Sequence, residues 1–468
     1  MSGNDQTMLE DILNKYLETK DSLDSETIAE LEVRFGTRSI SKISKNNFDN
    51  VIKYLLAKNF EFVDNGQYYL NIIANDIRFQ IFDMINIQNY CKTNKIDELN
   101  NIGYKFMEKS AFLIDGKIPA RVNFDDFNFR VSYSLEKNLN PSSPEVQDII
   151  KDWNEIKKFN RLINRFTLIN KDFPLKVDLS IVRESSNTSN IRDTNIFTTL
   201  PKYEIEFEFS NDETSASLLN NLIKKISKYI LSGLQDTNYP VPYSQINQIS
   251  QNYLTLIGSS RSTVTPGDFI GPSSITLQTT NIAPSNNSNI ISVRKDYTVT
   301  DKADGERKLL YINEKGKIYL INTQMNIQFT GAETKNNELF NTLLDGEHIK
   351  HNKLGTFINL YAAFDIYFIN SKDVRDLNFT GSSGTTNNYR WNLLDNVINK
   401  LNAVLVNTNK LPPIRVNIKR FYDVNEKQTV FMACDLINKQ ILTNQYEYET
   451  DGFIFTPKNY GVGLTNTD

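Results

Sequence analysis

Hydrophobic and polar residues alternate through much of the first half of the chain, and this pattern predicts β-strands. The alternating stretches are residues 31–37, 77–82, 127–136, 164–170, 175–182 and 203–210, and such alternation is typical of strands with one buried face. Helical periodicity is found at residues 8–20 and 215–234, the latter ending near Gly233. Many strands with few helices indicate an antiparallel barrel or sandwich. We expect the helix at 215–234 to be the last element of this first domain.

The pattern changes in the second half. Residues 258–290 are rich in Ser, Thr, Asn, Gly and Pro, as linkers are, although 269–278 is strand-like. After Tyr297, strands at 300–312, 316–322, 343–349, 361–370 and 451–457 accompany a helical segment around 389–403. We therefore predict an α+β multidomain protein, with domains at 1–250 and 291–468 joined by a linker segment at 251–290.

Composition narrows the class of protein. A chain of 468 residues suggests two to four domains, at about 100–200 residues per domain. The net charge of −4 argues against non-specific coating of nucleic acid, although 52 Lys and Arg residues are enough to build a local basic surface. Two distant cysteines provide neither a disulfide framework nor zinc-ligand spacing, which favours a reducing compartment. The first residues are polar, so a signal peptide is not expected. A membrane span is not expected either, because the sequence has no sufficiently long apolar run.

Two acidic strands stand at the ends of the predicted first domain. Residues i and i+2 of a strand share a face, so glutamates project together from each strand: Glu30 and Glu32 from the first, and Glu204, Glu206 and Glu208 from the last. Carboxylates crowded on one face repel each other unless a cation intervenes. A hard divalent ion with oxygen ligands removes that penalty, so the pattern indicates a Mg²⁺ or Mn²⁺ site.

The strands between them carry cations. Arg and Lys lining a cavity suit a polyphosphate, and the candidates are Arg78, Arg130, Arg165 and Lys176. Asp178 shares a face with Lys176 and either orders it or contributes to the metal site. The alternative is an ordinary amphipathic sheet with a charged face in solvent.

These strands also carry a family resemblance. ELEVRFG (30–36) and EIEFEF (204–209) resemble the first and last acidic motifs of the triphosphate tunnel metalloenzymes. The segments beginning at Ile77, Phe127 and Arg165 resemble the triphosphatase domain of giant-virus, asfarvirus and poxvirus mRNA capping enzymes. The resemblance implies an antiparallel eight-stranded tunnel barrel with flanking helices, and metal-dependent removal of the γ-phosphate from a 5′-triphosphate RNA end.

The resemblance also implies roles for single residues. The implied metal ligands or water-orienting groups are Glu30, Glu32, Glu204, Glu206 and Glu208, with Asp178 as a further metal ligand. The implied phosphate contacts are Arg78, Lys109, Arg130, Arg165 and Lys176.

A second cluster of chemistry begins at Lys302 in the sequence K-A-D-G-E-R. A free lysine is mostly protonated at neutral pH and is a poor nucleophile. We expect burial and neighbouring cations to lower the pKa of Lys302, so that its amine attacks an α-phosphate. Gly305 permits a tight turn, and Arg307 lies within reach of ribose or phosphates. The alternative is an ordinary charged Asp-Gly surface turn.

Later segments favour the chemical interpretation. The order K-x-D-G-x-R, D-G-E, F-D and D-G-F-I-F-T-P resembles motifs I, III, IIIa and IV of covalent nucleotidyltransferases. The resemblance implies a lysine–nucleotide phosphoramidate at Lys302, with pyrophosphate departure assisted by metal. Its implied nucleotide-binding residues are Asp304, Arg307, Asp345, Glu347, Asp365 and Asp451. From the pattern alone, Asp365 is equally a residue that caps the end of a strand.

The resemblance favours a capping enzyme over a ligase. DGFIFTP (451–457) and FIGPSSITL (269–277) resemble viral guanylyltransferases, and a triphosphatase barrel is the natural neighbour of such a domain. The implied substrates are 5′-triphosphate RNA and GTP, with a cap methyltransferase domain or subunit and RNA polymerase as partners. The implied location is the cytoplasmic viral factory or the virion. The alternatives are an RNA or DNA ligase-like nucleotidyltransferase and a non-catalytic capping scaffold that binds RNA ends.

The end of the chain departs from the family pattern. A lysine-rich motif V and an OB-fold follow motif IV in the family, whereas this sequence ends at YGVGLTNTD. We therefore expect an incomplete guanylyltransferase domain at 291–468, with weak or absent lysine–GMP formation. Cys91 lacks the phosphate-cradling loop of cysteine-dependent phosphatases, and Cys434 is expected to be a small buried residue. His348 and His351 are expected to be ordinary histidines without metal-ligand partners.

Overall fold

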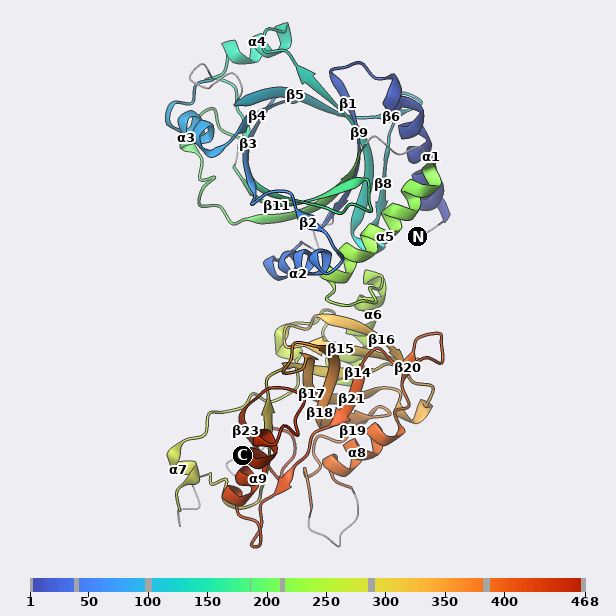
Figure 1. Ribbon diagram of the computed structural model, residues 1–468, viewed down its shortest axis with the longest axis vertical. Coiled ribbons are helices and arrows are strands. Elements are labelled where there is room, and N and C mark those ends of the chain that lie inside the picture. The colour runs from blue at the N-terminus through green and yellow to red at the C-terminus, as the bar shows by residue number, and fades with distance from the viewer. Residues whose placement is uncertain are drawn as a thin grey trace. The chain divides into compact units, whose positions relative to one another are not determined.

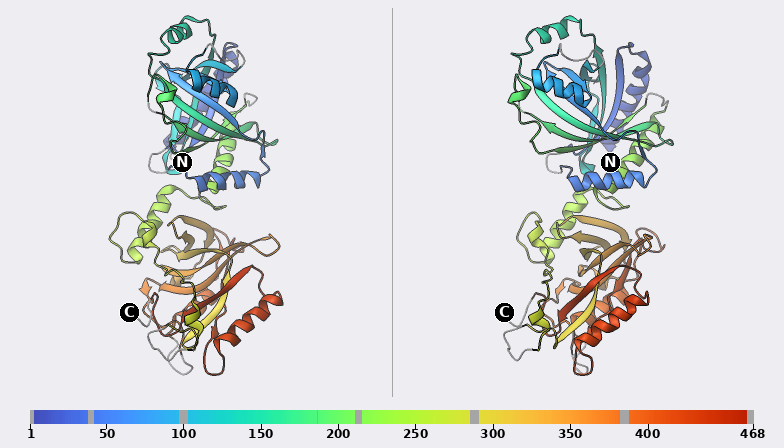
Figure 2. Two further views of the ribbon diagram at one scale, coloured as in Figure 1. Left: turned by 90° about the vertical axis from the view of Figure 1, so that its left-hand side faces the viewer. Right: turned by 60° about the vertical axis from the view of Figure 1, so that its left-hand side comes forward.

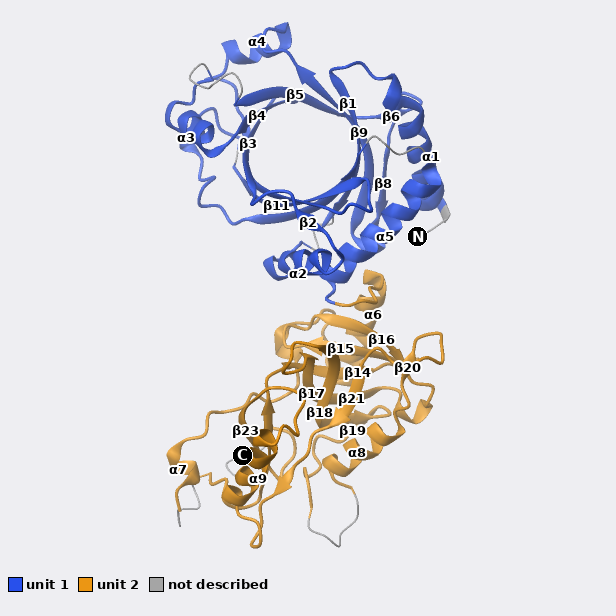
Figure 3. Cartoon of the chain, in the orientation of Figure 1, with its two compact units in different colours: residues 1–236 blue, residues 237–468 orange. Residues whose placement is uncertain are grey.

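A computed structural model describes residues 3–37, 42–96, 103–185, 187–210, 215–284, 291–381 and 388–463. The chain forms two compact units, residues 1–236 and 237–468 (Figure 3). Residues 237–250, which the sequence analysis assigned to the first domain, belong to the second unit in this division. Helix α6 (Tyr243–Leu256) therefore lies in the second unit.

The first unit is built on a closed antiparallel barrel of eight strands, as predicted (Figure 1). The strand order is β1-β12-β11-β10-β3-β4-β5-β9, and pairing of β9 with β1 closes the sheet. The bounds are β1 Thr27–Phe35, β3 Gln67–Ala74, β4 Ile77–Phe82, β5 Tyr104–Ala111, β9 Phe129–Leu139, β10 Phe159–Ile169, β11 Leu175–Glu184 and β12 Lys202–Phe209. Four short strands accompany it: β2 Glu61–Phe62, β6 Leu113–Ile114, β7 Ile118–Pro119 and β8 Arg121–Phe124.

The hydrophobic core of this unit lies outside the barrel wall. Leu31, Val33, Ile205 and Phe207 are fully buried and face a cluster that includes Ile226 of α5. The helices around this wall are α1 Gly3–Thr19, α2 Lys45–Leu56 and α5 Ala216–Leu234, whereas α3 Met84–Thr93 and α4 Pro144–Lys151 contribute to a second cluster against β3, β4 and β5. Because the apolar side chains point outward, the alternate, polar positions point into the barrel.

The second unit is α+β. Its larger sheet has the order β19-β18-β17-β14-β15-β16-β20, with β21 added parallel to β18; its smaller sheet has the order β22-β13-β23. The strands are β13 Tyr297–Ala303, β14 Glu306–Ile312, β15 Lys317–Asn322, β16 Ile327–Glu333, β17 Thr342–His351, β18 Phe357–Ile369, β19 Lys372–Asp373, β20 Val404–Leu405, β21 Arg415–Ile418, β22 Tyr422–Asp423 and β23 Thr450–Pro457. The antiparallel sheets were predicted, and the β18–β21 pair is a parallel exception.

Helices cover these sheets. Helix α8 (Arg390–Lys400) packs on β18. Helix α9 (Val430–Leu442), the red helix in Figure 2, packs along β13. Helix α7 (Thr279–Ile282) is a single turn. The prediction of a strand at 269–278 is wrong: Phe269 and Ile270 instead pack as loop residues against the larger sheet. Among the described residues, no helix is both long and apolar enough to cross a membrane.

Candidate functional sites in the two units

The register of the barrel strands brings the predicted glutamates and cations together on its inner surface. Glu206 lies opposite Asp178 on β11, and Glu208 lies opposite both Lys176 and, on β1, Glu32. Glu30 and Glu32 lie opposite Ser134 and Ser132 of β9. The register thus places these predicted side chains on one face of the sheet, and their roles in binding stay predictions.

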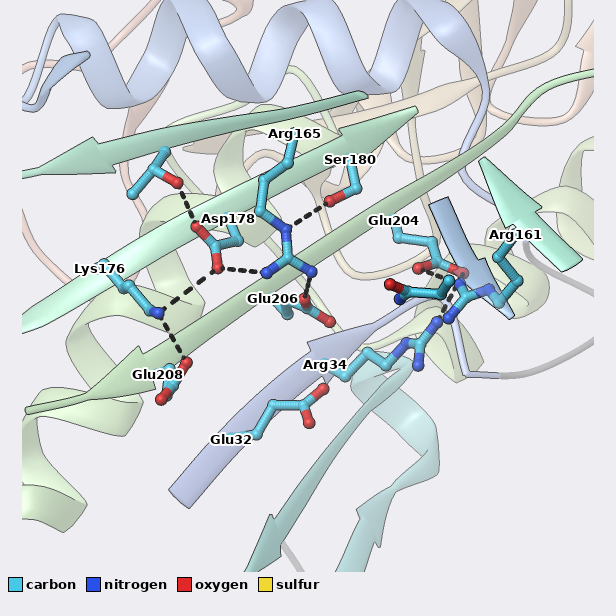
Figure 4. A network of polar contacts seen from close by, with 12 residues as sticks. Glu32, Arg34, Arg161, Arg165, Lys176, Asp178, Ser180, Glu204, Glu206 and Glu208 are labelled. Carbon is cyan, nitrogen blue, oxygen red and sulfur yellow. Dashed lines mark hydrogen bonds and ion pairs between the residues drawn. The ribbon is translucent and has the colours of Figure 1, made fainter. Parts of the chain in front are cut away.

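Arg165 joins three of these strands (Figure 4). Its guanidinium lies 3.2 Å from Asp178 and 3.0 Å from Glu206, and its Nε donates to Ser180 Oγ at 3.2 Å. Thr167 donates to the other oxygen of Asp178 at 2.6 Å. Asp178 is thus held by neighbours on β10, which leaves Arg165 oriented toward Glu206.

Lys109 of β5 is the cation beside the β1 glutamates. Its Nζ forms an ion pair with Glu30 and lies 3.3 Å from Glu32 and 3.6 Å from Glu136. Ser134 donates to Glu30 at 2.9 Å, and Arg78 lies 3.6 Å from Glu136. Burial opposes the charged amine, but the glutamates outweigh burial and raise the pKa of Lys109. Lys109 is therefore a fixed positive charge inside the barrel.

Glu32 and Glu206 form a coupled pair of carboxyl groups. Burial and the neighbouring charge of Glu206 raise the pKa of Glu32 to about 7. Burial also acts to raise the pKa of Glu206, but Arg165 and Arg34 outweigh it and, with a hydrogen bond from Glu32, keep that pKa below its usual value. Glu32 is accordingly the member of the pair that holds a proton, which it shares with Glu206 through their hydrogen bond.

The two ends of the acidic row on β12 differ. At one end, Glu204 forms ion pairs of 2.7 Å with both Arg34 and Arg161, and Arg161 lies 3.2 Å from Glu184. At the other end, Glu208 lies 3.1 Å from Lys176, as Figure 4 shows. Arg34, Arg161 and Glu184 were missed by the sequence analysis. Arg34 was recognisable because it lies two residues beyond Glu32, on the same face of the strand.

Arg130 is the predicted phosphate contact that lies at the edge of this network. It stands opposite Arg34 in the β1–β9 register, and its Nε donates to Asn123 at 2.8 Å. The structure thus orders Arg130 through an amide, whereas Arg165 and Lys109 are ordered by carboxylates.

The donor set fits a divalent cation at the Glu32–Glu206 pair, because a cation in place of the shared proton removes the repulsion there. The described residues nevertheless contain no group of three or more His, Cys, Asp or Glu side chains arranged to hold a metal ion. Asp178 and Glu204 are instead engaged by arginines. The larger ligand set of Glu30, Glu32, Glu204, Glu206 and Asp178 therefore remains a prediction.

In the second unit, Lys302 lies on β13 and Asp451 on the neighbouring strand β23. The Lys302 amine donates to the Asp451 carboxylate at 2.6 Å, and 40 % of the Lys302 side chain is exposed. The hydrogen bond to Asp451 raises the pKa of Lys302. Our expectation of a pKa lowered by burial and cations is therefore wrong for this conformation: the lysine is exposed and paired with an anion.

Arg307, which is partly exposed, pairs with the buried Asp345 beside two aromatic rings. Asp345 has no solvent exposure, lies 2.5 Å from Arg307 and accepts a hydrogen bond from Tyr367. The Arg307 guanidinium lies over the rings of Phe269 and Phe364, 5.4 and 5.7 Å from their centroids. A Cβ at Gly271 would lie 2.3 Å from Arg307 Nη2, so a glycine is needed where the loop passes this side chain. Asp345 thus orients Arg307.

Glu347 lies opposite Arg307 in the β14–β17 register and 3.7 Å from Lys419. Lys419 is buried; its amine donates to the Asp301 carbonyl at 2.6 Å and lies 3.3 Å from the Asp301 carboxylate. Burial raises the pKa of Glu347, while Lys419 opposes that rise. Lys419 and Asp301 were missed because they belong to none of the motifs.

Asp365, Asp304 and His348 have partners of their own, although Asp365 lies directly opposite Asp345 in the β17–β18 register. Asp365 is buried and bound by Arg390 of α8, with contacts of 2.8 and 3.1 Å to its two oxygens. Asp304 is exposed, and its backbone N–H donates to the Glu449 carbonyl. His348 bonds Asn359 and Lys308, and burial lowers its pKa to about 4. His348 is therefore a neutral, structurally bonded histidine.

The fold and the two clusters define a class. One unit is a closed barrel with opposed carboxylates and fixed cations inside, which suits a polyphosphate; the other presents a lysine of a K-x-D-G-x-R motif between acidic and basic groups, which suits a nucleotide. Each unit thus carries a cluster of side chains whose charges suit a phosphate-bearing ligand.

Comparison with known proteins gives the family. Residues 241–467 match the family described as mRNA capping enzyme, catalytic domain. The matched residues span nearly all of the second unit, residues 237–468. A probable mRNA-capping enzyme of Acanthamoeba polyphaga mimivirus is 24% identical over 305 residues, which cover 56% of this chain and 24% of that protein. These matches confirm the resemblance to giant-virus capping enzymes, although the aligned part spans only about a quarter of the viral relative.

Solved structures also align with the chain. The RNA triphosphatase domain of a trifunctional mimivirus mRNA capping enzyme has a TM-score of 0.35 and 17% identity, with coverage of 49% of this chain and 97% of that domain. The Pct1 RNA triphosphatase of S. pombe has a TM-score of 0.31 and 13% identity, with coverage of 49% and 92%.

Proposed function

We propose that the chain acts in mRNA 5′ capping. The first unit removes the γ-phosphate of a 5′-triphosphate RNA and leaves a diphosphate end, onto which the second unit transfers GMP from GTP. The observation that carries the proposal is the K-x-D-G-x-R lysine in a unit that matches the capping enzyme family, joined to a barrel lined by carboxylates and cations. A methyltransferase or polymerase partner and a viral-factory or virion location belong to the same proposal.

In the barrel, Arg165 and Lys109 provide the fixed positive charges that bind the phosphates, with Arg78 and Lys176 beside them. Glu32 and Glu206, with Glu30 nearby, are the groups that would hold Mg²⁺ or Mn²⁺. Such an ion polarises a phosphoryl oxygen and supports attack by water when bound. Asp178 keeps Arg165 oriented, so the guanidinium needs little reorganisation during the reaction.

In the second unit, the Lys302 amine attacks the α-phosphorus of GTP. A phosphorus–nitrogen bond forms, the bond to the bridging oxygen breaks, pyrophosphate leaves, and the amine proton passes to solvent. Arg307, held by Asp345, is positioned to contact ribose or phosphate. The diphosphate end of the RNA then attacks the same phosphorus and releases the lysine. Because Lys302 is paired with Asp451, that contact has to break before the attack.

The first activity is tested by phosphate release from triphosphate-ended RNA with Mg²⁺ and with Mn²⁺. Glu206→Ala is expected to reduce kcat by about 10²–10³-fold or more, as loss of a group that stabilises developing charge does. Glu108→Ala is the matched control, because Glu108 is exposed on β5 and faces away from the barrel interior. Equal activity of the two variants would contradict the assignment of the barrel site.

The second activity is tested with α-labelled GTP. An acid-labile adduct is expected on the wild-type chain and on a control, Lys372→Ala, in which an exposed lysine of β19 is removed. Lys302→Ala is expected to abolish it. Labelling from ATP in preference to GTP would instead favour a ligase-like nucleotidyltransferase.

A further inference from the structure

One mouth of the barrel interior opens into a cavity of about 520 Å³. Its lining residues come from the start of β1, the β10–β11 connection and the end of β12. Lys176 and Glu208 belong both to this lining and to the charged network inside the barrel. The cavity is therefore continuous with the proposed phosphate site.

Two apolar residues interrupt the polar inner surface at this mouth. Ile28 precedes Glu30 and Glu32 in the inward row of β1, and Ile169 lies directly opposite Lys176 on the inward face of β10. They are 47% and 44% exposed and both line the cavity, together with Phe173 and Pro174. Exposed apolar side chains beside a lysine suit a ligand that has a flat apolar part and an anionic part.

The opposite end of the same strands is arranged differently. Glu204 is paired there with Arg34 and Arg161, and Glu184 with Arg161 and Lys202. These ion pairs would have to break for a nucleotide to pass. Lys176 and Glu208 lie four residues from Ser180 and Glu204 along their strands, a separation of about 13 Å. The two ends are thus distinct in position and in chemistry.

We propose that the RNA 5′ end enters through the Ile28–Ile169 mouth, with the first nucleoside held in the cavity. This inference rests on the proposed triphosphatase function. The base and ribose contact Ile28 and Ile169, and the phosphates pass Lys176 toward Arg165 and the Glu32–Glu206 pair, with the γ-phosphate deepest. The mouth then distinguishes a nucleoside triphosphate end from inorganic polyphosphate, which makes Ile28 and Ile169 specificity-determining residues.

The test compares two substrates on the full chain: a short 5′-triphosphate RNA and inorganic tripolyphosphate. The Ile28→Ala/Ile169→Ala variant is expected to raise the KM for RNA by about fivefold, equivalent to about 1 kcal/mol. Its kcat and its KM for tripolyphosphate are expected to stay unchanged. The Kd of a 3′-labelled RNA, measured by fluorescence anisotropy in EDTA, is expected to rise with the KM.

Leu200→Ala is the matched control, because Leu200 is 89% exposed and precedes β12 at the other end of the barrel. An unchanged RNA KM in the double variant, or a raised KM in Leu200→Ala, would overturn the proposed direction of entry while leaving the triphosphatase assignment intact. If the wild-type chain cleaves neither substrate, the proposed function fails and this inference fails with it.

Discussion

The charged groups of the barrel and those around Lys302 are arranged in opposite ways. In the barrel, glutamates and cations project from the strands of a single closed sheet, so their positions follow from its hydrogen-bond register. Around Lys302, the groups come from two sheets: Lys302 and Asp451 from the smaller, and Arg307 and Glu347 from the larger. The first site is fixed by the fold, whereas the second depends on how two sheets are held together.

The two sites also differ in the solvent exposure of their charged side chains. Glu32 is largely buried and has the raised pKa of a crowded carboxyl group, whereas Lys302 and Asp451 meet at the surface, where Asp451 is 75% exposed. Buried charges that are fixed in place act strongly on a ligand, while exposed ion pairs exchange easily with water. For the proposed reactions, the charged groups of the barrel are therefore already in place, whereas the Lys302–Asp451 contact has to break first.

The largest expected effect is on the stability of the second unit, and it comes from removing the buried Asp365–Arg390 ion pair. Asp365→Ala leaves the buried Arg390 without its carboxylate, and we expect a loss of about 3–5 kcal/mol in the free energy of unfolding. Urea unfolding measures this through Trp391 fluorescence in a Trp153→Phe background, because the chain has only these two tryptophans.

Asp376→Ala is the control for that measurement, since Asp376 is exposed in the same unit. Its stability is expected to stay within about 0.5 kcal/mol of the background. A stable Asp365→Ala variant that fails to bind GTP would instead support the predicted nucleotide-binding role of Asp365 over a role in stability.

A smaller effect is expected from Glu32→Gln in the barrel. The folded-state pKa of Glu32 is about 7, above its ordinary value of 4.5, so the protonated carboxyl group stabilises the fold at acidic pH. That stability is lost as the pH rises through about 7. Glutamine cannot ionise, and in EDTA at pH 8 the variant is expected to be more stable than wild type by on the order of 2 kcal/mol.

Thermal unfolding between pH 4.5 and 8 measures the difference, which is expected to vanish at the acidic end. Adding Mg²⁺ or Mn²⁺ is expected to stabilise the wild type and narrow the gap. Glu108→Gln is the control, because it removes an exposed carboxylate from the same barrel. A Glu32→Gln effect that is independent of pH would contradict the proton shared between Glu32 and Glu206.

The same contrast explains what could be predicted from the sequence. Strands β1 and β12 were recognised because buried Leu31 and Phe207 alternate with polar residues. Strand β3 was missed because its inward face carries Tyr69 and Ile73, so the alternation is lost. The alternation of polar and apolar residues predicts each strand separately, and it cannot identify a strand that has apolar residues on both faces.

Long-range partners explain what else could not be predicted from the sequence. Asp365 is bound by Arg390, 25 residues away, and its nucleotide-binding role stays a prediction. The pKa of Lys302 was predicted in the wrong direction because Asp451 lies 149 residues away. Lys419 belongs to no motif and is recognised only through its contacts with Asp301 and Glu347. Ion pairs of this kind are set by tertiary structure, which the local pattern does not encode.

The smallest effect concerns the exposed Lys302–Asp451 pair itself. Because the hydrogen bond to Asp451 raises the pKa of Lys302, Asp451→Asn is expected to lower that pKa and to increase the free amine at a given pH. Acylation of Lys302 by an amine-reactive reagent at pH 8, followed by peptide mass spectrometry, is expected to accelerate by up to about fivefold, as suits an exposed pair. Lys372 in the same digest is the internal control. An unchanged rate at Lys302 would mean that Asp451 does not hold the lysine in its charged form. The proposed difference between the barrel, whose groups are already in place, and Lys302, whose contact with Asp451 has to break, would then lose its main support.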